Sequence, residues 1–147
     1  MAFRITLPLP AGWKSRVETL QEMDGAEVSH LEAYLPNDAR QSDDAEIDIC
    51  VGPMPADTTA QDEALANYAD VVGWDDDDPE DFDPLTEWPF QRRKAFGFEA
   101  LCEDDSPLRV MCVEIRKDVL VVMTLVARDD EELVKVVQYV ESHLRIG

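Results

Sequence analysis

The chain has little positive charge and no long apolar run. Its 147 residues contain 13 Lys and Arg against 33 Asp and Glu, so its formal net charge at pH 7 is -20. A field of this sign repels phosphates and anionic lipid headgroups, which argues against nucleic acid and membranes as partners and favours a protein with a basic patch. The longest apolar stretch, Val119 to Ala127, has the length of a strand and is too short to cross a bilayer.

Cysteines are few, and the N-terminal stretch lacks the features of a signal peptide. "MAFRITLPLPAGW" has neither a basic n-region nor a continuous apolar segment, so we expect no signal peptide and a cytoplasmic protein. Cys50, Cys102 and Cys112 are an odd number without a C-x-x-C pair, and each lies in an apolar stretch. We therefore expect reduced cysteines that pack as small hydrophobic side chains.

The length of the chain is that of a single domain, which we expect to span residues 1–147. Apolar and polar residues alternate in several stretches of it. This alternation predicts strands over 3–10, 28–36 and 45–52. Residues 90–103 and 108–127 also read as strands, with a tight hairpin at Arg116, Lys117 and Asp118.

Two segments have helical spacing instead. Residues 59–72 carry apolar side chains at helical intervals after a capping box formed by Thr58 and Gln61, and residues 130–144 do so with Asp129 or Asp130 as the N-cap. Strands in clusters with two amphipathic helices predict an α+β fold, in which an antiparallel sheet is covered by two helices in an α/β/α sandwich. The expected core comprises Phe3, Ile5, Leu7, Trp13, Ile47, Ile49, Leu65, Val121, Met123, Leu125, Val136 and Val140.

The segment "GWDDDDPEDFDP" concentrates acidic side chains beside aromatic ones. A mixture of aromatic residues and charge is typical of interface hot spots, so it indicates a docking surface for a basic protein, although a solvated connector explains the same residues. The aromatic residue Trp88 and the basic residues Arg92 and Arg93 follow shortly after this segment. The predicted partner-binding residues are Trp74, Asp75, Asp76, Asp77, Asp78, Phe82, Trp88, Arg92 and Arg93.

A cation-binding alternative rests on the acidic residues within 75–87. Asp76, Asp78, Glu80 and Glu87 fall at positions 1, 3, 5 and 12 of the EF-hand pattern. Asp81 stands where that pattern requires glycine, and the residues after Glu87 read as a strand and not as an exit helix. Calcium binding is therefore the alternative to the protein-binding reading.

Catalytic motifs are missing as well. The two histidines, His30 and His143, accompany neither a G-x-S-x-G nor an H-E-x-x-H motif. Each directly follows a serine, but neighbouring residues on a strand or helix point their side chains apart, so neither pair is expected to form a catalytic dyad. No glycine-rich phosphate loop occurs. We expect no enzyme, no cofactor and no metal ligands, with a small hydrolase lacking a recognisable motif as a further alternative.

Four landmarks in order carry a resemblance to a known superfamily. They are Leu9-Pro10-Ala11-Gly12-Trp13 after a first strand, a helix after the early strands, Gly97-x-x-Ala100, and Val140-Glu141-Ser142-His143-Leu144 in a last helix. Together they resemble the PsbP-like superfamily, which includes the PsbP subunit of photosystem II, a Ran-binding import factor, DcrB-like lipoproteins and chaperone-adaptors of type VI secretion. The resemblance implies an α/β/α sandwich and a non-catalytic binding role. We therefore expect an adaptor or chaperone-like protein, which acts as a monomer or homodimer.

Overall fold

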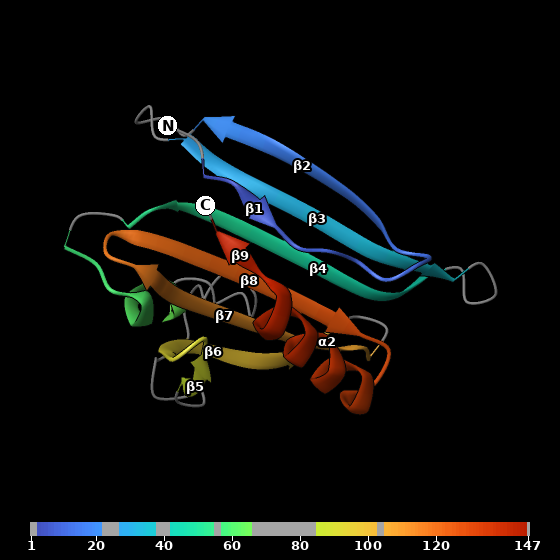
Figure 1. Cartoon of the computed structure of the whole chain (residues 1–147). Coiled ribbons are helices and arrows are strands. Elements are labelled where there is room, and N and C mark those ends of the chain that lie inside the picture. The colour runs from blue at the N-terminus through green and yellow to red at the C-terminus, as the bar shows by residue number, and fades with distance from the viewer. Residues whose placement is uncertain are drawn as a thin grey trace.

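One antiparallel sheet of seven strands dominates the chain (Figure 1). The computed structural model describes residues 3–21, 27–37, 42–54, 57–65, 85–102 and 105–146. The sheet has the strand order β2-β3-β4-β8-β7-β6-β5. Its strands are β2 (Lys14–Gln21), β3 (Glu27–Asn37), β4 (Ser42–Pro53), β5 (Thr86–Phe90), β6 (Arg93–Leu101), β7 (Pro107–Arg116) and β8 (Val119–Ala127).

Two runs of neighbouring strands meet in the middle of this sheet. β2, β3 and β4 follow one another from one edge inward, and β5, β6, β7 and β8 follow one another from the other edge. The two runs join where β4 pairs with β8, with Ile49 opposite Met123. All six strand pairs are antiparallel.

The main core lies on one face of the sheet, which we call the helix face. Helix α2 (Asp130–His143) crosses this face over β7 and β8, and the short pair β1 (Ile5–Thr6) and β9 (Arg145–Ile146) lies beside it (Figure 1). Asp129 caps α2, as the sequence predicts, because its carboxylate accepts a hydrogen bond of 2.8 Å from the Glu132 amide. Leu133, Val136 and Val140 of α2 are buried against the sheet.

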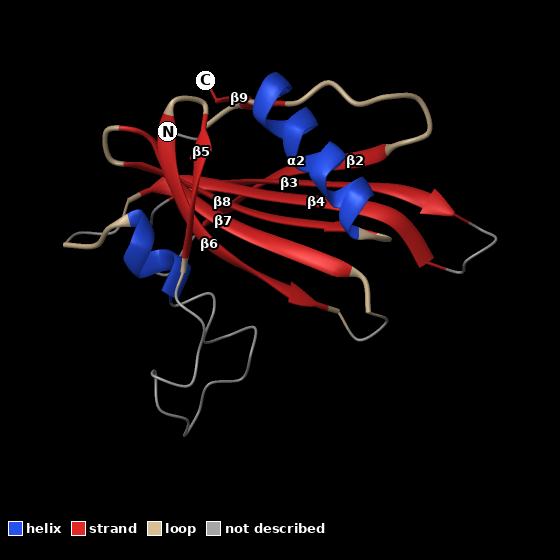
Figure 2. Cartoon of the chain, turned by 90° about the horizontal axis from the view of Figure 1, so that it is seen from below, coloured by secondary structure: helices blue, strands red, loops and turns tan. Residues whose placement is uncertain are grey.

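The opposite face, which we call the open face, is apolar only over part of its area. Residues 60–65 form a helical segment on this side, away from α2 (Figure 2). Ala60 and Ala64 pack there against Cys112 and Leu120. Over β2, β3 and β4 the same face carries His30, Glu32, Tyr34, Glu46 and Asp48, so it is polar.

The predicted α/β/α sandwich covered by two helices is wrong, because the described chain is mostly antiparallel β structure. α2 covers only part of the helix face. Of the expected helix 59–72, residues 60–65 are helical, Thr59 precedes the helix, and residues 66–72 lie outside the described residues. The prediction failed because the sheet has seven strands, including the unpredicted strand β2, where a second helical layer was expected. In β2 polar and charged residues surround Val17, so its alternation is hard to recognise.

Several local predictions need correction too. The expected first strand over 3–10 is paired only at Ile5–Thr6, since the prolines that follow have no amide hydrogen to give to a ladder. Leu65, expected in the core, is 46% exposed. The capping box is formed one residue later than predicted, by Thr59 and Asp62, whose side chains accept each other's backbone amide hydrogens.

Other local predictions are confirmed. The turn at Lys117 and Asp118 joins β7 to β8, and nine of the twelve expected core residues are buried, namely Ile5, Leu7, Ile47, Ile49, Val121, Met123, Leu125, Val136 and Val140. Phe3 and Trp13 are partly buried against the same core. Among the described residues no helix has the length and apolar character needed to cross a bilayer.

Candidate binding pocket

A pocket of about 290 Å³ opens on the helix face between α2, the N-terminal segment and strands β3 and β4. Its walls are mainly apolar, and four charged residues stand among them. It is lined by Leu9, Pro10, Trp13, Leu35, Asp44, Ala45, Ile47, Arg128, Glu132, Lys135, Val136 and Tyr139. The pocket thus combines residues from both ends of the described chain.

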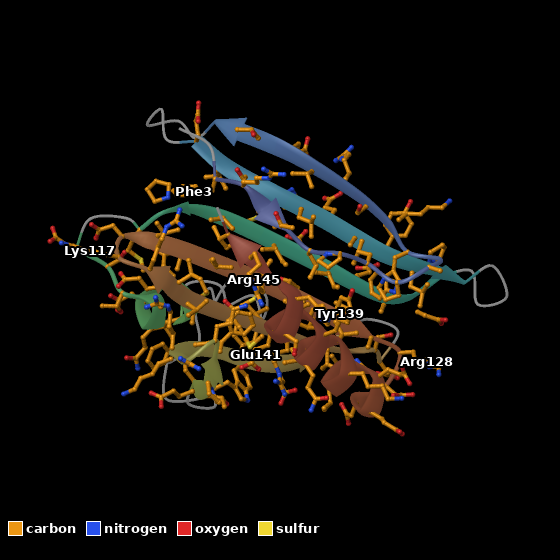
Figure 3. All side chains as sticks on the ribbon, in the orientation of Figure 1. Phe3, Lys117, Arg128, Tyr139, Glu141 and Arg145 are labelled. Carbon is orange, nitrogen blue, oxygen red and sulfur yellow. The ribbon has the colours of Figure 1, made fainter. Side chains whose placement is uncertain are left out.

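A tight corner holds the N-terminal wall in place. The Trp13 amide donates to the Pro10 carbonyl at 3.4 Å, and Gly12 has φ +94°, a conformation that favours glycine. The Tyr139 hydroxyl of α2 donates to the Pro8 carbonyl and so ties this segment to the helix. Figure 3 shows Tyr139 on α2, with Arg128 near the start of the helix.

The charged side chains on the α2 side form an ion-pair chain. Glu132 lies 3.7 Å from the Arg128 guanidinium and 3.2 Å from the Lys135 ammonium, and the two basic side chains are 49% and 62% exposed. The Arg128 amide also donates to the Asp44 carbonyl at 3.1 Å, which fixes the start of α2 against β4. Because the first turn of α2 adds Asp130 and Glu131, acidic groups outnumber basic ones at this edge.

The lining combines apolar side chains with a few charged groups. The twelve lining residues include no histidine, cysteine, serine or threonine. Their polar groups are the carboxylates of Asp44 and Glu132, the cations of Arg128 and Lys135, and the Tyr139 hydroxyl, which donates to the Pro8 carbonyl. Small-molecule pockets usually enclose about 300–1,000 Å³, and this one lies at the lower end of that range. Its volume fits one large apolar side chain better than a cofactor.

Three of the predicted partner-binding residues, Trp88, Arg92 and Arg93, are described, and none of them lines the pocket. Trp88 is half-buried on β5, with the Arg109 guanidinium 4.3 Å from its ring centre. Arg92 occupies the turn between β5 and β6 with φ 68°, and Arg93 begins β6; both are exposed. Trp74, Asp75, Asp76, Asp77, Asp78 and Phe82 lie outside the described residues.

The neighbouring turn residue Gln91 binds the end of α2. Its side-chain amide donates to the carbonyls of Glu141 at 2.9 Å and Leu144 at 2.8 Å, and its own backbone amide donates to the Glu141 carboxylate at 3.3 Å. The β5–β6 turn therefore positions the C-terminal end of α2.

Of the calcium-ligand alternatives, only Glu87 lies among the described residues. It is exposed within β5, so a strand follows it, as the sequence predicts, in place of the exit helix of an EF-hand. Asp76, Asp78 and Glu80 lie outside the described residues.

Neither histidine forms a dyad with the serine before it. Ser29 is buried on the helix face and donates to the Phe3 carbonyl, whereas His30 lies on the open face. The His143 ring stacks on Tyr139 with ring centres 4.1 Å apart.

Sequence reasoning missed the pocket, although it singled out two of its parts. The sequence predicts Trp13 and Val136 as core residues, and Val136 is buried while Trp13 is partly buried. The pocket exists only where the segments that carry these two residues are packed together. Comparisons with protein-family models, curated proteins and solved structures gave no match for this chain.

Proposed function

We propose that the chain is a non-catalytic protein-binding module of the adaptor or chaperone kind. The observation that carries the proposal is the pocket on the helix face, whose walls are mainly apolar. The occupant is one apolar anchor side chain of a protein partner. An aromatic or leucine residue suits the volume and matches the anchors that dominate binding energy in many interfaces.

The acidic charge of the chain indicates which residues flank that anchor in the partner. The net charge of -20 and the excess of acidic groups at the start of α2 favour a partner segment that carries lysine or arginine next to its anchor. Glu132 already holds Arg128 and Lys135 by ion pairs, so these two basic groups are partly neutralised. The expected partner motif is an apolar anchor with basic flanks.

The resemblance to the PsbP-like superfamily implies the same class of function. It also implies an α/β/α sandwich, which differs from the mostly β fold described above. The proposal therefore rests on the pocket and the charge, with the resemblance as secondary support.

Peptide display against the purified chain tests the proposal. We expect the selected peptides to share one aromatic or leucine anchor with basic neighbours, and a synthetic peptide to lose binding when the anchor becomes alanine or the flanks become glutamate. A selection without a shared anchor, or equal binding of the alanine peptide, contradicts the proposal.

Two valines on α2 give a matched pair of variants. Val136→Phe fills the pocket, whereas Val134→Phe adds the same atoms at a position that is 46% exposed. We expect Val136→Phe to weaken peptide binding at least tenfold, about 1.4 kcal/mol, and Val134→Phe to leave it unchanged. Thermal melts of both variants show whether each is folded, and equal affinities in two folded variants refute the pocket as the site.

The acidic segment adds a kinetic prediction. Replacing Asp75, Asp76, Asp77 and Asp78 by asparagine removes four negative charges from a chain whose net charge is -20. We expect slower association with the basic peptide and a weaker dependence of the association rate on salt. Equal rates and equal salt slopes would leave this segment as a solvated connector.

A further inference from the structure

A second cluster of reactive side chains lies on the open face, on the other side of the sheet from the pocket. His30 of β3 and Asp48 and Cys50 of β4 offer an imidazole, a carboxylate and a thiol whose ligand atoms all lie within 4.8 Å of one another. The His30 Nε2 atom is 3.0 Å from Asp48 Oδ2, and Cys50 Sγ is 3.9 Å from Asp48 Oδ1. Within the described ranges, no other group of three His, Cys, Asp or Glu residues meets this condition.

The strand register puts these three donors together. His30 is directly opposite Cys50 in the β3–β4 ladder, and Asp48 lies two residues along β4, so all three side chains point to the same face. β4 is paired on both sides, with β3 and with β8, so its backbone is held. The donors are thus preorganised on neighbouring paired strands.

The donor set indicates which ions it suits. Nitrogen, sulfur and oxygen donors together are typical of Zn²⁺ and related divalent transition metals, whereas Ca²⁺ and Mg²⁺ take oxygen ligands. Bond lengths of about 2.0–2.3 Å to a tetrahedral ion place the ligand atoms roughly 3.3–3.8 Å apart. The two distances given above lie close to that range, so small side-chain movements suffice.

The surrounding groups also match a metal site. The Glu18 carboxylate lies 3.8 Å from His30 Nδ1, so a small side-chain movement brings it into hydrogen-bond range of Nδ1 and leaves Nε2 to bind a metal. Glu32 lies 3.9 Å from Nε2 and adds a further negative charge. The nearby Arg16 forms ion pairs with both glutamates, at 3.0 and 3.6 Å.

The cluster is accessible to ions. The His30 side chain is 12% exposed and the Asp48 side chain 44%. Asp48 and Glu32 also line a shallow hollow of about 260 Å³. Solvent can therefore reach the cluster from this side.

We propose that His30, Asp48 and Cys50 form a three-ligand binding site for a divalent transition-metal ion of the zinc class. The metal binds His30 Nε2, an Asp48 carboxylate oxygen and the Cys50 sulfur, the thiol releases its proton to solvent and binds as thiolate, and the fourth position is open to water or another small ligand. Glu18 is a positioning residue that orients His30. The site is independent of the pocket, which lies on the other face.

Cobalt titration tests this assignment directly. The reduced, chelator-treated protein is titrated with Co²⁺ in excess Mg²⁺, so that carboxylates elsewhere are saturated with Mg²⁺. We expect one equivalent of Co²⁺ to bind, with the charge-transfer absorption of a thiolate ligand and the strong visible bands of a tetrahedral ion. One equivalent of Zn²⁺ should displace it.

Variants identify the ligands. We expect Cys50→Ser to abolish the thiolate band, Cys102→Ser, the matched control, to retain it, and Glu18→Gln to weaken Co²⁺ binding about 10–100-fold while the band stays. A wild-type protein without a thiolate band, or a band that Cys102→Ser removes and Cys50→Ser does not, overturns the proposal. Circular dichroism of each variant establishes that it is folded, and the wild-type titration decides the question even if a variant is not.

Discussion

Replacing Gly97 by alanine should destabilise the protein strongly, because β6 and β7 approach each other closely at this residue. A Cβ atom there would lie 1.8 Å from the Val110 carbonyl oxygen and 2.8 Å from its carbon, whereas real Cβ atoms stay beyond 3.0 Å. The clash is with backbone, so the strands must separate locally. Overpacking costs about 1–3 kcal/mol and each weakened ladder hydrogen bond about 0.5–1.5 kcal/mol, which together give about 3 kcal/mol.

Gly52→Ala is the matched control for this prediction. Its added Cβ would lie 3.1 Å from Cγ2 of the half-buried Val28 side chain, which can shift, so we expect a change within about 1 kcal/mol. For a chain of this size 3 kcal/mol lowers the melting temperature by roughly 6–12 °C. Thermal and urea melts of the three proteins check the difference. A Gly97→Ala protein that melts within about 2 °C of Gly52→Ala would refute the reasoning.

Three further predictions concern stability. Burial, with Glu63 nearby, raises the pKa of the Cys112 thiol from 9.0 to about 12, so the folded state keeps a proton that the unfolded chain loses between these values. Stability should fall over that pH range by up to about 1.4 kcal/mol per unit, and urea melts should show a smaller fall in Cys112→Ala. Asp129→Ala removes the cap of α2 and should cost about 1 kcal/mol in the same melts. Gln91→Ala leaves two carbonyls at the end of α2 without this donor and should cost about 1–2 kcal/mol, measured by chemical unfolding.

Local sequence signals predicted the local structure well. The α2 stripe through Val136 and Val140, and its cap Asp129, lie within a few residues of one another, so their pattern is sufficient to place the helix. The β7–β8 hairpin is also local, because its turn residues directly join two apolar runs. The expected strand over 3–10 is paired only at Ile5–Thr6. Phe3, Ile5 and Leu7 alternate because they pack against the core of the seven-stranded sheet, and the prolines that follow cannot donate to a ladder.

Sites assembled from distant segments could not be predicted in this way. The pocket needs the corner at Trp13 to lie against Val136, and nothing in either segment specifies the other. The metal cluster needs the β3–β4 register, because a shift of one residue would move Asp48 and Cys50 to the opposite face from His30. The residue types were visible, but their juxtaposition depends on pairing over many residues.

The β4–β8 ladder has a consequence for how the chain folds. Each of the two runs of strands can form through short-range hairpins, whereas this ladder joins Pro53 to Val119 and Ala45 to Ala127, so it must close a long loop. Loop-closure entropy and high contact order make such a step slow. We therefore expect docking of the two preformed halves along β4 and β8 to limit the folding rate, and substitutions in this seam to slow folding more than substitutions in the outer hairpins do.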